Sequence, residues 1–491
     1  MLVQNNNNSG HATNDVADMM RRMEVEDFAE ENNIDFDAHD NAQFERVSKM
    51  YISENTREGY QSCMKRLLLF LDDSNPECVS DYAKTALQDA FPEGATVKHK
   101  NKAVIACALQ LIVAANDTSK PIIFEAVTVK IFVKFLFTMA RKNTDGNTFL
   151  SKSGCGSYRS AFKDLYRQCK VSVPPAFEAE LTTQFKGLLR ARAEEKEAKG
   201  SRLSEGKDPM PFALYKRLCA KMMADGSKDA IFAHAFLALT WNLVCRSKNT
   251  VFIHRNHISW DHDALSIQFA HMKTDMAGED AKHKRHIYAN PHCLHICAVT
   301  ALAKYLAVFQ AKDDNMLFDK NSYGRFGKYL GNLVKDSKLE MEQLGIKVED
   351  IGVHSIRKGA ATYCCGGTTA APHIAAVCNR AGWTMGKVKD TYIQYAAAGD
   401  QHVGRVVSGL PVLSVKYACT PPYIRIKSTD HNNKPNDEEA ENVCHLDDLT
   451  SVIGVLFPCQ ITTEFRPVAI ACAAALFFAK EYIHSLQPLT T

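Results

Sequence analysis

Six side chains between positions 246 and 392 could together cleave a phosphodiester without a metal. In chain order they are Arg246, Lys273, His354, Arg357, Trp383 and Tyr392. Two guanidinium groups can bind the non-bridging oxygens of a phosphate, each through two parallel hydrogen bonds. A tyrosine phenol can attack phosphorus covalently, and a lysine in a desolvated pocket can protonate the leaving sugar oxygen. The set predicts phosphoryl transfer with Tyr392 as nucleophile, Lys273 as general acid and the arginines as a clamp.

The order and spacing of these residues match a known pattern. Trp383 precedes Tyr392 by nine residues, and Arg246 precedes Lys273 by 27. The chain resembles the tyrosine recombinase (integrase) family, whose pattern is Arg, Lys, His-x-x-Arg, His or Trp, then Tyr. The residues around Arg246 and His354 look more like recombinases of Crypton-type eukaryotic mobile elements than like bacteriophage integrases.

This resemblance implies site-specific cleavage and rejoining of DNA through a 3′-phosphotyrosine intermediate, as used in recombination or integration. It implies metal-independent catalysis with no cofactor. The implied fold is mainly α with a small antiparallel β-sheet, and consists of a helical core-binding domain and a recombinase catalytic domain. The expected partner is double-stranded DNA, bound by a homo-oligomer that is a tetramer when synapsed, with no membrane and no small-molecule substrate. A mobile-element protein of this kind is expected in the nucleus.

Several positions leave other interpretations open. Many family members carry an acidic residue three positions after the first arginine, where this chain has Asn249. A DNA-binding protein that has lost strand transfer is therefore the alternative function. Tyr395 is the rival nucleophile, although its spacing from Trp383 does not match the family. A lysine in a turn is usually only solvated, and a tryptophan often packs in a core. The catalytic roles assigned to Lys273 and Trp383 therefore depend on the position of these residues in the series.

Histidines and cysteines crowd the middle of the chain. They are His254, His257, His262, His271, His283, His286, His292 and His295, with Cys293 and Cys297 nearby. Structural zinc sites use paired ligands at fixed spacing, each pair held by local structure. These residues do not form a compact Cys/His finger pattern, so zinc is a minor alternative and no metal ligand is assigned.

Composition sets the outer bounds. The chain has 491 residues, 46% hydrophobic and 23% charged, which is ordinary for a globular protein of two or three domains. Its net charge of +3 is too small to predict nucleic-acid binding, so that binding must come from local patches. The 16 cysteines lack a CxxC framework, which indicates an intracellular, reducing compartment. No secretory signal is expected.

Apolar residues recur at helical spacing from Thr56 to about Arg192, which predicts a helical domain. One of its helices carries Lys152, Arg159, Lys163 and Arg167. These cations form either a solvated face or a DNA contact. An apolar helix from Ile231 to Cys245 should then present Arg246. The apolar stretch Val468–Ala479 is about a dozen residues, shorter than the roughly 20 that a bilayer needs, and is expected to be a buried helix.

Strands are predicted after Arg246. Alternating residues give a hairpin from about Asn256 to Phe269 and a third strand from Arg285 to Ala289, with Lys273 in the connecting turn. The basic cluster in that region includes Lys282, Lys284 and Arg285, which we interpret as a DNA-backbone contact, a nuclear localisation patch or a solvated loop. His354 should begin a helix that places Arg357 on the same face.

These patterns divide the chain into expected regions. They are a disordered acidic segment at 1–45, a helical DNA-binding domain at 46–192, a linker at 193–208, the catalytic domain at 209–415, and a C-terminal region at 416–491 that is a polar stretch followed by a helix.

Overall fold

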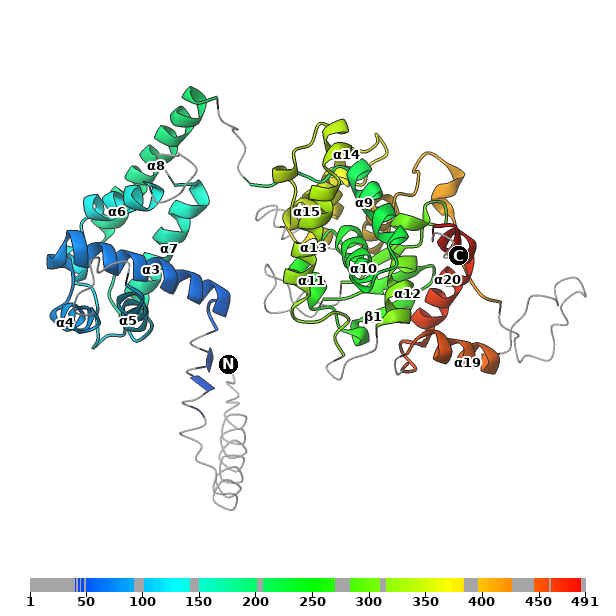
Figure 1. Ribbon diagram of the computed structural model, residues 1–491, viewed down its shortest axis with the longest axis horizontal. Coiled ribbons are helices and arrows are strands. Elements are labelled where there is room, and N and C mark those ends of the chain that lie inside the picture. Colours follow the sequence, from blue (N-terminus) through cyan, green and yellow to red (C-terminus); the bar gives the residue numbers. More distant parts are fainter. Residues whose placement is uncertain are drawn as a thin grey trace, which may run out of the picture. The chain divides into compact units, whose positions relative to one another are not determined.

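The computed structural model has two compact units, residues 1–205 and 206–491 (Figure 1). The structure describes residues 40, 43–44, 46–47, 50–91, 101–141, 150–200, 206–269, 283–309, 315–383, 396–425, 446–458 and 461–486. The predicted segment 1–45 and the residues of the C-terminal polar stretch therefore lie mostly outside the described residues.

The first unit is built from helices. They are α3 (Glu54–Ser74), α4 (Asp81–Asp89), α5 (Lys102–Val113), α6 (Val129–Arg141), α7 (Lys152–Gln168) and α8 (Pro175–Ala198), with 3-10 turns at Pro76–Cys78 and Phe124–Ala126. Serine side chains begin two of them: Ser53 Oγ accepts from the Thr56 amide at 3.4 Å, and Ser151 Oγ accepts from the Gly154 amide at 3.0 Å. Helix α8 includes residues 193–198, which composition had assigned to the linker.

Aromatic rings lock α3, α6 and α7 together. The Phe70 and Phe135 ring centroids lie 5.4 Å apart, and Phe132 stacks on Phe162 at 4.8 Å. The leucines of α3 that recur at helical spacing, Leu67, Leu68 and Leu71, are fully buried with these rings. The helical periodicity predicted for this half of the chain is confirmed.

The second unit wraps helices around one central helix. Its helices are α9 (Phe212–Ala224), α10 (Lys228–Asn242), α11 (Ser247–Val251), α12 (Ala298–Val308), α13 (Ser322–Asp336), α14 (Lys338–Gln343), α15 (Val353–Gly366), α16 (Ile374–Ala381), α18 (Ala397–Val407), α19 (Leu446–Leu456) and α20 (Arg466–Leu486). Every residue of α10 from Ala230 to Asn242 is buried, and α9, α12, α13 and α15 pack around it. A helix apolar on all sides needs such a surrounding shell.

A small antiparallel sheet follows α11. Its strands β1 (Ile258–Asp261), β2 (Ala264–Ile267) and β3 (Arg285–Tyr288) pair in the order β1-β2-β3. Asp261 pairs with Ala264 across a two-residue turn, and Ala264 pairs with Tyr288. The predicted hairpin and third strand are confirmed, and so is the mainly α fold with a small antiparallel sheet.

Helix α20 is longer than the dozen residues expected from the sequence. It has 21 residues and, among the described residues, is the helix whose length and composition would allow it to cross a membrane. A buried core helix of a protein outside a membrane can be equally long and apolar. Val468, Ala469 and Cys472 are fully buried, and α20 packs against α12, α9 and β1. The C-terminal helix thus belongs to the core of the second unit.

Helix α18 approaches β3 closely at Gly404. A Cβ atom added there would lie 2.2 Å from the His286 carbonyl oxygen, whereas one added at the exposed Gly331 of α13 would contact nothing within 4 Å. We expect Gly404→Ala to lower the free energy of unfolding by about 1–3 kcal/mol through overpacking. Gly331→Ala, the matched helical control, should raise it by roughly 0.5–1 kcal/mol. Urea unfolding measures both, and equal stability of the two variants would contradict the close packing.

Candidate active site

A sharp turn between α10 and α11 presents Arg246. Val244 has a left-handed backbone with φ of 50°, which is rare for a β-branched residue and costs about 1–3 kcal/mol. Its amide donates to the Trp241 carbonyl at 3.1 Å, so the turn is hydrogen-bonded. Arg246 is the N-cap residue of α11, and its carbonyl accepts from the Asn249 amide at 2.7 Å. The strained turn places the Arg246 side chain half-buried at the start of a new helix.

Buried hydroxyl groups of α10 and α11 stabilise this turn. Thr250 Oγ1 of α11 lies 2.9 Å from Thr240 Oγ1 of α10 and 3.2 Å from Cys245 Sγ. Thr240 also donates to the Phe236 carbonyl at 2.7 Å. Because these groups are fully buried, breaking one bond would leave a polar atom unsatisfied. The network therefore holds α11, and with it Arg246, against the central helix.

Helix α15 carries His354 and Arg357, as the sequence predicted. Its N-cap is Gly352, whose amide donates to Ser355 Oγ at 3.0 Å. His354 is exposed in the first turn, and Arg357 lies one turn later, half-buried. Helix α15 ends at a glycine pair, with Gly366 as its last residue and Gly367 as its C-cap.

Arg357 lies near Arg246 and against Trp383. The pKa of Arg357 is lowered to about 10, mainly by burial and to a smaller extent by the nearby positive charge of Arg246. The Arg357 guanidinium lies over the Trp383 ring at 5.0 Å from its centroid, a cation–π contact. It also donates through Nη2 to the Ala381 carbonyl, while its Nε is buried without a hydrogen-bond partner among the described residues. Two like charges are thus held in a partly desolvated place.

The end of α16 sets the position of Trp383. Gly382 adopts a left-handed conformation with φ of 65°, which ends the helix and turns the chain. The Trp383 amide then donates to the Cys378 carbonyl at 2.9 Å. Lys273, Tyr392 and its rival Tyr395 lie outside the described residues, so the structure neither supports nor opposes their predicted roles.

The prediction of Arg285 as a DNA contact is wrong. Its side chain is 3% exposed in β3, where Nε donates to the Arg380 carbonyl at 3.3 Å and the guanidinium lies 5.1 Å from the Phe269 ring centroid. A basic run in the sequence does not show which of its members turn inward. Lys284 remains partly exposed and pairs with Asp261 at 3.0 Å, and Lys282 lies outside the described residues.

The cations of α7 are divided between structural and exposed positions. Arg159 pairs with Glu178 of α8 and donates to Thr182 Oγ1 at 2.7 Å, and Lys163 also binds Glu178 at 2.7 Å. These bonds hold α8 against α7. Because the Arg159 side chain is 25% exposed and that of Lys163 is 42% exposed, their role in DNA contact stays a prediction. Arg167 and Lys152 are exposed, and both remain DNA-binding predictions.

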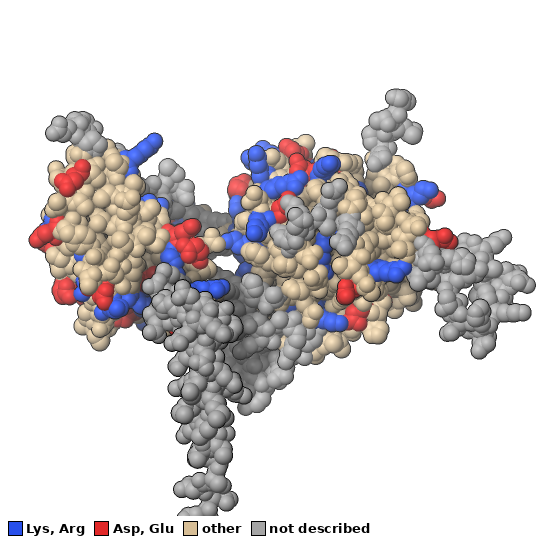
Figure 2. Space-filling view, turned by 90° about the horizontal axis from the view of Figure 1, so that it is seen from below, with Lys and Arg blue, Asp and Glu red and all other residues tan. Residues whose placement is uncertain are grey.

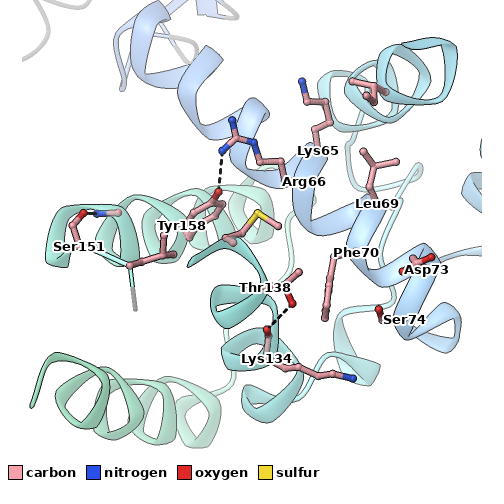
Figure 3. A pocket seen from close by; sticks show the side chains of 14 residues that line it. Lys65, Arg66, Leu69, Phe70, Asp73, Ser74, Lys134, Thr138, Ser151 and Tyr158 are labelled. Atoms are coloured by element: carbon pink, nitrogen blue, oxygen red, sulfur yellow. Dashed lines mark hydrogen bonds between the residues drawn. The ribbon is translucent and has the colours of Figure 1, made fainter. Parts of the chain in front are cut away.

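A groove of about 820 Å³ lies between α3, α6 and α7 (Figure 3). Its lining includes the cations Lys65, Arg66 and Lys134 and one carboxylate, Asp73. Arg66 Nη1 donates to the Tyr158 hydroxyl at 3.0 Å on the groove wall. Elsewhere charge is mixed: on the face seen in Figure 2, Lys and Arg are interspersed with Asp and Glu. Net positive lining makes this groove the candidate anion-binding surface of the first unit.

Sequence reasoning missed a buried ionic cluster in the second unit. Arg380 Nη1 binds Asp400 Oδ1 at 2.5 Å, and Asp400 Oδ2 accepts from His286 Nδ1 at 2.9 Å. Burial by itself would raise the pKa of Asp400, but the Arg380 charge and the His286 hydrogen bonds outweigh it and leave the pKa below its ordinary value. The one sequence signal was an arginine shortly after the apolar run 374–378, and no spacing rule identifies its partner.

The histidine-rich region does not assemble a metal site within the part of the chain that the structure describes. No three or more His, Cys, Asp or Glu side chains there are grouped to hold an ion. His286 binds Asp400, while His295 Nδ1 lies 3.3 Å from the Tyr482 hydroxyl.

Comparisons with known proteins give weak likenesses. No protein-family model matches this chain, and no curated protein matches it. Similar solved structures include the XerH site-specific recombinase bound to difH substrate in a pre-cleavage complex, with 13% identity over 69% of this chain and 92% of that chain and a TM-score of 0.35. A Flpe–Holliday junction complex has 13% identity over 90% of this chain and all of that chain, also with a TM-score of 0.35. At these values neither likeness bears on function, which is argued below from the chain's own residues.

The crowded positive charge at Arg246 and Arg357 should bind a small oxyanion. At constant ionic strength, replacing chloride with tens of millimolar phosphate should raise the melting temperature by a few degrees. Arg246→Ala should lose most of this rise, because one of the two phosphate-binding groups is gone. Differential scanning fluorimetry measures the shift. The exposed Lys338→Ala is the control for the general effect of phosphate on folded proteins, and an equal rise in all three proteins would contradict an anion site.

Proposed function

We propose that this chain cleaves and rejoins DNA strands through a covalent 3′-phosphotyrosine intermediate. One observation carries the proposal: Arg246 and Arg357 lie close enough for one charge to lower the pKa of the other, with Trp383 against Arg357. Among the described residues, the charges that act on Arg357 are Arg246, which lowers its pKa, and the Cys245 thiol, which raises it; no carboxylate is among them. Two neighbouring guanidiniums, with no described carboxylate acting on Arg357, are suited to an anionic ligand, and a scissile phosphate supplies two non-bridging oxygens.

The chemistry then follows from residue types. The Tyr392 phenol attacks phosphorus, so a P–O bond forms to tyrosine and the bond to the 5′ oxygen breaks. The phenolic proton leaves to His354 or water, and the 5′ oxygen takes a proton from Lys273. Cleavage leaves a 3′-phosphotyrosine and a 5′-hydroxyl. Because the phosphodiester bond energy is retained, a second 5′-hydroxyl can reverse the reaction without ATP.

The arginines act in this proposal by matching the charge that develops at phosphorus. A free phenol has a pKa near 10, so only about one in a thousand is ionised at neutral pH. Guanidinium groups bound to the non-bridging oxygens lower the barrier to attack. Trp383 adds an indole wall that keeps water from the phosphate, with an N–H available as a donor.

DNA contact by the first unit would use the groove between α3, α6 and α7. Lys65, Arg66 and Lys134 supply positive charge along it. Ser151, the N-cap residue of α7, also lines the groove, and the first turn of α7 contains no acidic residue. A phosphate backbone in the groove would meet both the cations and the positive end of the helix dipole.

The alternative function, a DNA-binding protein without strand transfer, is favoured by one residue. Asn249 stands where the resembled family often has a carboxylate, and an amide gives the neighbouring arginine no opposing charge. The adduct experiment below separates the two functions, because the alternative binds DNA without forming a covalent bond.

Assembly, origin and compartment extend the proposal. We propose a homo-oligomer, a tetramer when two DNA sites are synapsed, encoded by a mobile element of the Crypton type and acting in the nucleus. For assembly, support comes from exposed apolar residues of the second unit: Phe477 and Phe478 on α20, and Tyr423, line a groove of about 630 Å³. Exposed apolar groups gathered in one place often mark protein interfaces.

A covalent protein–DNA adduct is the direct test. A duplex nicked near the cleavage site loses the short 5′-hydroxyl strand after attack, so the adduct accumulates. We expect a band shifted in a denaturing gel with the wild-type protein and none with Tyr392→Phe, which should still bind the duplex. Tyr395→Phe is the matched control and should form the adduct normally. DNA binding without an adduct in the wild type would leave the alternative function, and adduct loss only in Tyr395→Phe would reassign the nucleophile.

The groove of the first unit has its own test. Each phosphate neutralised by a lysine contributes about 0.9 to the slope of log K against log salt. Lys65→Ala/Lys134→Ala should therefore reduce the slope by about 2 in mobility-shift titrations. Lys130→Ala/Lys186→Ala, which removes two exposed cations of the same unit outside the groove, is the control. A slope reduced equally by both double variants would show diffuse attraction in place of a defined surface.

A further inference from the structure

The Arg380 guanidinium is fully buried and bridges separate parts of the second unit. Its side chain has no exposed surface. Nε and Nη2 both donate to the Asn242 carbonyl, at 3.1 and 2.9 Å, and Nη2 also donates to the His286 carbonyl at 2.7 Å. Nη1 donates to Asp400 through its carbonyl at 3.3 Å and its carboxylate at 2.5 Å. One side chain thus joins α16 to the end of α10, to β3 and to α18.

Asp400 completes the cluster from α18. Its second carboxylate oxygen accepts from both the amide and Nδ1 of His286, at 2.8 and 2.9 Å. The other end of α18 is also bound to α10: the Trp241 indole donates to the Val407 carbonyl at 3.1 Å, and Ser408 donates to Asn242 Oδ1 at 2.9 Å. Helix α18 is therefore fixed at both ends to the segment that leads into Arg246.

The backbone beside Arg380 is bound by two further arginines. Arg285 Nε donates to the Arg380 carbonyl, and Arg357 Nη2 donates to the next carbonyl, that of Ala381. Trp383 follows two residues later and lies against Arg357. The position of Trp383 thus depends on the same few bonds that fix Arg380. The chain then continues through Tyr392 to Ala397, where α18 begins and the cluster holds the chain again.

We propose that Arg380 and Asp400 are positioning residues of the active site. Their buried ion pair fixes the end of α10, the end of α16 and the start of α18 in one arrangement, and so sets Arg246, Arg357 and Trp383 relative to each other. The inference rests on the proposed function for the reaction that is positioned. Stability alone does not account for the pair, because buried ion pairs replaced by apolar residues of similar size are often no less stable. A misplacement of 1 Å, by contrast, can cost about 100-fold in rate.

The experiment replaces both charges together in the full chain. Removing one partner leaves the other charge buried and unpaired, which is strongly destabilising, whereas Arg380→Met/Asp400→Leu removes both. The same substitutions at the exposed pair, Arg325→Met/Asp229→Leu, are the matched control, since that pair joins α13 to α10 on the surface. The variant Arg380→Lys keeps the buried charge but loses the fork that reaches several acceptors at once.

Four measurements are compared: the melting temperature, the DNA affinity, the rate of adduct formation at saturating nicked duplex, and amide hydrogen exchange. For Arg380→Met/Asp400→Leu we expect folded protein with near wild-type DNA affinity, an adduct rate lower by about 100-fold, and faster exchange at Gly382, Trp383 and α18 only. Arg380→Lys should show the same pattern more weakly. The surface control should match the wild type in all four measurements.

Each outcome bears on the proposal. A wild-type adduct rate in Arg380→Met/Asp400→Leu, or in Arg380→Lys if the double variant does not fold, overturns the positioning role. Loss of rate in proportion to lost folded protein in both variants also overturns it, because the pair would then be only structural. If the wild type forms no adduct, the proposed function fails, and local exchange at Trp383 and α18 still decides whether the pair fixes these segments. Exchange unchanged there would overturn the inference independently.

Discussion

A guanidinium removed from water constrains the whole second unit. Burying a charge costs several kcal/mol unless a counter-charge and hydrogen bonds compensate it. Arg380 obtains that compensation from Asp400 and from the carbonyls of Asn242 and His286. Those acceptors belong to a central helix, a strand and a late helix that are far apart in sequence. The charge of Arg380 is therefore compensated only when all three elements come together. The turn that presents Arg246 begins two residues after Asn242.

The active-site region contains further costs that the surrounding core has to support. Val244 is held in a left-handed conformation, and the charges of Arg246 and Arg357 repel each other in a partly desolvated place. Strain and uncompensated charge of this kind concentrate where a ligand completes the site. The buried part of α10, from Ala230 to Asn242, and the Thr240–Thr250 hydroxyl bond give the rigid base that such a turn requires.

The periodicity of apolar residues predicts local structure, that is, individual helices and strands. The helical spacing of α3, α6 and α7 and the alternation in β1 and β2 are local signals, and their predictions are confirmed. The proximity of Arg357 to Arg246 and Trp383 agrees with the expectation from chain order and spacing, whereas the catalytic roles of all six residues remain predictions. Interaction partners distant in sequence could not be predicted. Glu178 binds two cations of α7, and no sequence pattern linked Arg380 to Asp400.

The arginines of the second unit show why residue type alone does not assign a role. Arg285 and Arg380 are buried with their donors directed at backbone carbonyls, so neither can meet a ligand. Arg246 is half-buried at a helix start, and its positive charge acts on Arg357. Arg357 has features of both the buried and the ligand-facing arginines. One of its nitrogens donates to the Ala381 carbonyl, while burial and the charge of Arg246 lower its pKa. It therefore connects the buried ionic cluster to the proposed phosphate-binding surface.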